Sequence, residues 1–199
     1  YILNVAEYEI ENISDYLRKL VALTAEKLNI SITVSCSEMG SALQELPQLY
    51  KEAQRYLQYR LLFGNAFVLN KERCAANEAN TNTSYSARVE KKLLDGIRCS
   101  NLEIVTATLN SLREEFQQLR YEYVLANVIE LVTKIKMCIG EKKDVIQSTE
   151  FAEMYPQILS ANTLPAMFEI INAYLTKGLQ IDTYRDIFTD IRDQRFVEQ

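Results

Sequence analysis

The chain has no histidine, and its four cysteines are scattered without a CxxC pair. Metal sites gather Cys and His at short spacing, so a structural zinc is not expected. Nucleophilic catalysis of the Ser–His or Cys–His kind lacks its base. Glycine-rich phosphate loops such as GxGxxG are also missing. These absences predict a protein that is not an enzyme and has no catalytic residue, metal or cofactor.

Glycine and proline are scarce, with five and three residues in a chain of 199. Most of the chain is therefore free to form helices. No apolar run approaches the roughly 18 residues of a membrane span. Cys36 and Cys138 lie in apolar surroundings and are predicted to be small buried side chains. Unpaired cysteines suit a reducing compartment, which predicts a cytoplasmic location and no membrane contact.

Acidic residues outnumber basic ones, and the formal net charge is −5. The basic residues are interleaved with acids, as in Arg113-Glu114-Glu115. Gripping phosphate backbones requires clustered Lys and Arg. This segment is therefore not expected to bind nucleic acid by itself, and its charges are interpreted as solvated helix faces.

Residues 11–70 alternate between two periodicities. Residues 11–28 have the apolar spacing of an amphipathic helix, and residues 30–36 then alternate apolar with Ser and Thr, as in a half-buried strand. A second helix over 46–61 and a short strand at 66–69 follow. The predicted inner stripe of that second helix consists of Leu46, Leu49, Tyr50, Ala53, Leu57 and Leu61.

The sequence after residue 70 predicts a polar linker followed only by helices. Residues 73–86 are rich in Asn, Thr and Ala without an apolar period. Helical spacing returns over 89–97, 102–119, 124–139, 151–159, 163–178 and 184–191, with Thr163 as an expected N-cap. The predicted fold class is α+β, predominantly α. Its predicted parts are an α/β piece at 1–72, a linker at 73–86 and a helical domain at 87–199.

One stretch carries a family resemblance. It comprises Thr33-Val34-Ser35-Cys36-Ser37, then Leu49-Tyr50-Lys51-Glu52-Ala53, then Leu57-Gln58-Tyr59-Arg60 and Gly64-Asn65-Ala66. It resembles the closing strand–helix–strand of GGDEF domains, in the degenerate form found in bacterial AraC-type transcriptional regulators. Ser37 stands where that pattern has Gly, and no Gly-Gly-Asp/Glu signature is present. The resemblance therefore carries over no catalytic or nucleotide-binding residue.

The resemblance implies a signal-relay segment of such a regulator. The segment would lie between an input domain, either a receiver or a membrane-tethered sensor, and a helix-turn-helix domain beginning after Gln199. Its partners would be the other domains of the same chain and a second copy in a homodimer, with DNA bound only through the missing C-terminal domain.

Two alternatives from other classes stay open. A small-ligand or nucleotide sensor would show a concave apolar cavity with a few convergent polar groups. A helical protein–protein interaction scaffold would show an exposed apolar patch instead.

Overall fold

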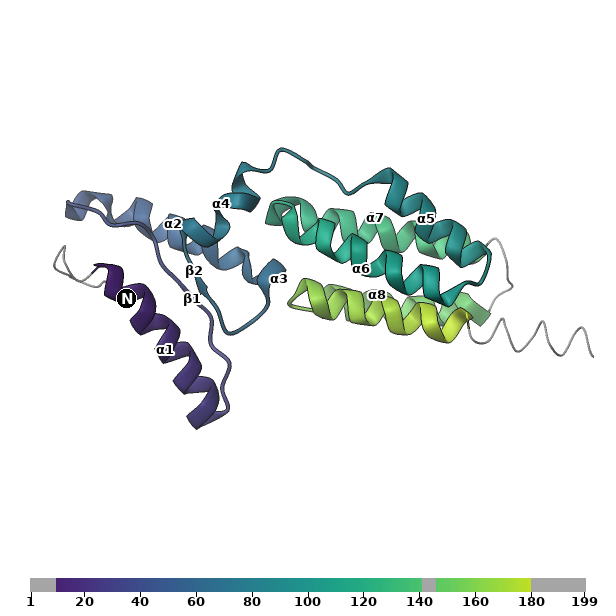
Figure 1. The fold of residues 1–199 in the computed structure, drawn as a ribbon, viewed down its shortest axis with the longest axis horizontal. Coiled ribbons are helices and arrows are strands. Elements are labelled where there is room, and N and C mark those ends of the chain that lie inside the picture. Colours follow the sequence, from purple (N-terminus) through teal and green to yellow (C-terminus); the bar gives the residue numbers. More distant parts are fainter. Residues whose placement is uncertain (1–9, 141–145, 180–199) are drawn as a thin grey trace, which may run out of the picture. The chain divides into compact units, whose positions relative to one another are not determined.

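A computed structural model describes residues 10–140 and 146–179 of the chain. The protein is predominantly helical with a small parallel sheet, as the predicted fold class states. Its contacts divide it into two compact units, Tyr1–Thr81 (unit 1) and Asn82–Gln199 (unit 2). Figure 1 shows the elements of both units in chain order. The helix predicted at 184–191 lies outside the described residues.

Unit 1 follows the predicted order of helix, strand, helix and strand, and then adds a helix. Its elements are α1 (Ile10–Leu28), β1 (Val34–Ser35), a 3-10 turn (Leu43–Glu45), α2 (Leu46–Gln58), α3 (Arg60–Phe63), β2 (Val68–Leu69) and α4 (Lys71–Ala79). α1 packs on β2, and α2 packs on β1. The helix at 11–28 is thereby confirmed.

The two strands pair in parallel, with Val34 opposite Val68. The Val34 amide donates to the Phe67 carbonyl at 3.0 Å, and the Cys36 amide donates to the Leu69 carbonyl at 2.8 Å. α2 and α3 supply the crossover that parallel strands require. The predicted strand at 30–36 is shortened to two residues, and residues 32–37 are all half-buried rather than alternating. Only one neighbouring strand exists in the described part of the chain, so few backbone groups can pair.

α2 and α3 bury a face that agrees with the predicted one only in part. Tyr56, Tyr59 and Leu62 are fully or nearly fully buried, whereas Tyr50 and Leu57 are exposed. The predicted stripe is therefore right in part, because its other members are half-buried: Leu46, Leu49, Ala53 and Leu61. Tyr56 can be buried because its hydroxyl donates to Glu52 at 2.9 Å. Burial, together with this carboxylate, raises the pKa of Tyr56 to about 12.

The first half of the predicted linker is helical, which corrects the prediction for 73–86. α4 begins at an N-cap, where the Arg73 amide donates to the Asn70 side chain at 3.0 Å. Cys74 and Asn77 are buried. Arg55 of α2 pairs with Glu78 at 3.2 Å. The alanines of this stretch favour a helix once such neighbours are available.

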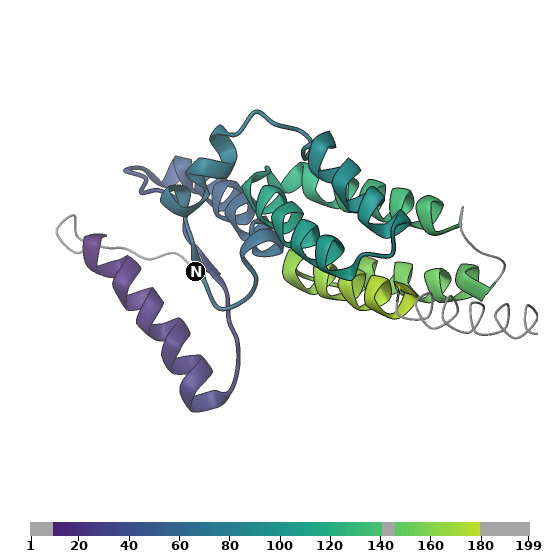
Figure 2. The same cartoon turned by 45° about the vertical axis from the view of Figure 1, so that its right-hand side comes forward.

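All the regular elements of unit 2 are helices within its described residues. They are α5 (Ala87–Arg98), α6 (Leu102–Gln118), α7 (Tyr121–Gly140), α8 (Ile146–Ser160) and a helix over 164–179. Figures 1 and 2 show α5, α6, α7 and α8 side by side. The Ala166 amide donates to the Thr163 hydroxyl at 3.4 Å, which confirms Thr163 as the cap. The core includes the fully buried Leu112, Phe116, Leu131, Ile135 and Leu164.

Candidate functional site

Reactive side chains do not converge within the described residues. No group of three or more His, Cys, Asp or Glu there could hold a metal ion. All four cysteines are free thiols. Cys138 is buried as predicted, whereas Cys36 is only half-buried. Burial raises the pKa of the Cys74 thiol to about 11, and a thiol held in its protonated form is a poor nucleophile.

Across residues 10–140 and 146–179, the structure contains no helix with both the length and the apolarity of a membrane span.

A groove of about 720 Å³ in unit 1 lies between α1 and the end of β2. Arg18 and Arg73 line it, together with apolar side chains that include Phe63 and Phe67. The Arg73 guanidinium lies 4.9 Å from the Phe63 ring centroid and 4.6 Å from that of Phe67. These cation–π contacts hold the corner where Ala66 adopts a φ of 66°. Arg73 therefore stabilises the corner, and Arg18 is paired with Asp15 at 2.8 Å.

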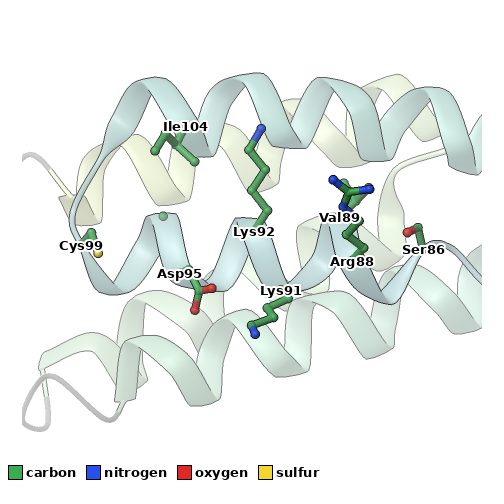
Figure 3. Close-up of a pocket in the computed structure, with 9 residues that line it drawn as sticks. Ser86, Arg88, Val89, Lys91, Lys92, Asp95, Cys99 and Ile104 are labelled. Carbon is green, nitrogen blue, oxygen red and sulfur yellow. The ribbon is translucent and has the colours of Figure 1, made fainter.

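A second hollow, of about 730 Å³, lies along α5 and the start of α6 in unit 2. Figure 3 shows Lys91 and Lys92 leaving α5 in opposite directions, so their charges do not meet over one point. Gly96 lines the hollow, and a Cβ added there would lie 3.0 Å from the Ile104 side chain. Glycine at this position therefore allows α5 and α6 to approach closely. Arg88 rises on the same side of α5 as Lys92 (Figure 3), so the groups on that side of the hollow are both basic.

Residues 83–86 (the anchored segment) are held on unit 2, although sequence patterns placed them in a linker. The Asn127 side-chain amide donates to the Thr83 carbonyl at 2.8 Å, and Glu115 accepts from the Ser86 amide at 2.8 Å. The buried Tyr85 ring stacks on Phe116 with centroids 4.9 Å apart. Burial and the neighbouring Glu90 carboxylate raise the pKa of Tyr85, so the side chain stays neutral.

Sequence patterns missed the anchored segment because its partners are distant in the chain. Asn127 is 44 residues from Thr83, and Glu115 is 29 residues from Ser86. The one available signal was Tyr85 itself, a large aromatic residue at the end of a polar stretch. Residues 80–82 are therefore the stretch between the end of α4 and the anchored segment, outside any helix.

Limited proteolysis should cut residues 80–82 before residues 83–86. Proteases need an extended, accessible backbone, and α4 protects residues up to Ala79 while Tyr85 and Asn127 hold the following stretch. Mass spectrometry of early fragments made with a non-specific protease identifies the cut. Tyr85→Ala should extend cleavage into 83–86, whereas Tyr50→Ala, at a side chain that is 65% exposed, should leave the pattern unchanged. Equal early cutting at 83–86 in the unaltered chain would contradict the anchor.

α1 also presents an apolar face to solvent. Tyr16, Leu20 and Leu23 are 67%, 40% and 51% exposed. Large apolar side chains gathered on one exposed face are typical of a surface that binds another protein.

No protein family, curated protein or solved structure matches this chain. Its function must therefore be argued from the residues and their arrangement.

Proposed function

We propose that this chain is the non-catalytic signal-relay segment of an AraC-type transcriptional regulator, acting through contacts with other domains and by dimerisation. The strand–helix–strand order of unit 1 supports the proposal. Val34 and Ser35 form β1, Ala53 lies within α2, and Gly64 makes the turn before β2 with a φ of 85°. Such a φ favours glycine.

The observation that carries the proposal is the division into two separately packed units with a three-residue connection at 80–82. A relay needs bodies whose relative placement can change, and short exposed connections permit this. Anchoring of residues 83–86 keeps the connection short. A short connection leaves the two units little independent movement, so that a displacement of one unit is transmitted to the other.

The remaining parts of the proposal follow from charge and family likeness. With a net charge of −5, the segment lacks the clustered cations of a DNA-binding surface. DNA would be bound by a separate helix-turn-helix domain of the full-length regulator. The segment itself would work in the cytoplasm, whether the input comes from a receiver domain or from a membrane-tethered sensor.

The groove in unit 1 supports a second candidate function, a small-ligand or nucleotide sensor. Its two arginines and two phenyl rings could receive an anion with an aromatic part. The relay remains the better supported function because both arginines already have partners, Arg18 in Asp15 and Arg73 in the phenyl rings.

Lengthening the connection in the full-length polypeptide tests the relay. Gly-Ser-Gly-Ser inserted between Asn80 and Thr81 should leave affinity for the DNA target unchanged. The signal-dependent change in transcription should fall by at least about tenfold, a size typical of coupling between domains. Thr81→Ser, which keeps the length, is the control. A full response from the lengthened chain, or a polypeptide without DNA-binding activity, would overturn the proposal.

A further inference from the structure

The first helix of unit 1 is apolar on two faces. Leu17 and Val21 are its buried residues, on the side that packs on β2. Tyr16, Leu20 and Leu23 are at least 40% exposed. These three residues and Lys27 follow the alternating four- and three-residue spacing of a coiled-coil seam. We call these four residues the α1 stripe.

A surface helix of a small domain usually has one apolar face and one polar face. The α1 stripe breaks this pattern, since it runs beside a face that is already buried. Leaving Tyr16, Leu20 and Leu23 in water forgoes the favourable burial of their apolar surface. The stripe is therefore suited to a partner that also presents an apolar helix.

We propose that the α1 stripe docks against the same stripe of a second copy of this chain, with the two α1 helices antiparallel. The inference rests on the proposed function, because it names the surface of the dimerisation proposed there. It is argued from the order of the residues along the stripe and the charges beside it.

The antiparallel register makes the stripe complementary to itself. When Leu20 lies opposite Leu23 of the second copy, Tyr16 lies opposite Lys27 of that copy. An ammonium group facing a tyrosine ring is a favourable contact. A parallel pair would instead place Lys27 against Lys27 and repel.

Charges on the outer edge of the stripe support the same register. Lys19 and Glu26 are seven residues apart and so lie on the same flank of the seam. Glu26 pairs with Lys27 of its own helix at 2.7 Å. In the antiparallel register, Lys19 of each copy lies beside Glu26 of the other and adds a second cation to that carboxylate, in two contacts related by symmetry. The inner edge of the stripe, on the side of the buried face of α1, has no charged residue of this kind. Leu17 is buried there, and the Thr24 hydroxyl donates to the Leu20 carbonyl at 2.5 Å. The charges on the outer edge therefore favour the antiparallel pairing of the two α1 helices.

A single pair of α1 helices is a small interface, at or below the roughly 1,200 Å² lower end of stable complexes. Association is therefore expected at micromolar concentrations or weaker. Sedimentation equilibrium of the chain over a range of micromolar concentrations should show a monomer–dimer equilibrium. Leu23→Glu should weaken it by at least about tenfold, because a hydrated carboxylate would replace the apolar contact with Leu20 of the second copy. Leu43→Glu, at an 80% exposed leucine on the 3-10 turn, should leave it unchanged.

A charge exchange tests the register. Lys19→Glu and Glu26→Lys should each weaken the dimer, because each brings like charges together across the pair. The double variant should restore it, since opposite charges then face each other again. Circular dichroism shows whether each variant keeps its helices, and these exposed positions should tolerate the changes.

Three results would overturn the inference. They are a monomer at every concentration, a dimer insensitive to Leu23→Glu, and a failure of the double charge exchange to restore association. None of them bears on the lengthened-connection experiment, so the relay can survive the loss of this interface. A dimer that passes all three tests while the relay fails would show a real interface in a protein of another function.

Discussion

Replacing Phe116 with alanine is expected to lower the free energy of unfolding of unit 2 by about 3–5 kcal/mol. Phe116 is fully buried on α6 and stacks on Tyr85 of the anchored segment. It also meets the Phe168 ring edge-on, with centroids 5.4 Å apart. The side chain thus joins three segments that are distant in the chain. Its removal leaves a cavity that helices held by neighbouring contacts can fill only in part.

Chemical denaturation followed by circular dichroism, together with hydrogen exchange of the α6 and α7 amides, measures this loss for unit 2. Leu125→Ala is a matched control on α7, because Leu125 is 41% exposed and should change stability by no more than about 0.5 kcal/mol. Tyr85→Ala combined with Phe116→Ala should cost less than the sum of the single losses, since the two rings share one contact. A loss below about 1 kcal/mol for Phe116→Ala would contradict the aromatic cluster as the centre of unit 2.

Leu69→Asp is expected to unfold unit 1 while unit 2 stays folded. Leu69 is fully buried at the end of β2, and a carboxylate there would lose its water without gaining a partner. Such a change costs several kcal/mol, which is a large part of the stability of a unit of this size. Hydrogen exchange should show the amides of unit 1 losing protection and those of α6 and α7 keeping it.

Val34→Asp is the control for that experiment. Val34 lies on the neighbouring strand directly across from Val68, but it is only half-buried. Its carboxylate can reach water, so the loss should be clearly smaller than for Leu69→Asp. Equal losses would mean that β1 is more enclosed than its exposure indicates. Loss of protection throughout unit 2 after Leu69→Asp would show that the two units unfold as one.

Helix positions were largely predictable because the signals that set them are local. Asn101 and Thr163 cap helices through amides three residues further along the chain. The apolar spacing from 102 to 139 predicted α6 and α7 within a few residues of their observed bounds. Backbone hydrogen bonds within a helix span four residues, so a short stretch of sequence contains most of what decides them.

Three features of the structure depend on tertiary contacts and could not be predicted from local sequence patterns. The buried face of α2 is set by Tyr56, which packs inward because its hydroxyl donates a hydrogen bond to Glu52, while the more apolar Leu57 stays outside. The strand at β1 is short because only β2 pairs with it among the described residues. The stretch at 73–86, polar throughout most of its length, becomes half helix and half anchored segment because Arg55, Glu115 and Asn127 reach it from far along the chain.

The amino-acid sequence by itself therefore determined the helical class, the order of elements, the net negative charge and the motif that resembles a family. Tertiary structure alone decided where the connection between the units lies and which apolar side chains remain in water. The physical reason is the range of the interactions. Helix propensity, capping and periodicity act within about one turn of helix. Burial and anchoring depend on partners brought together only when the chain has folded.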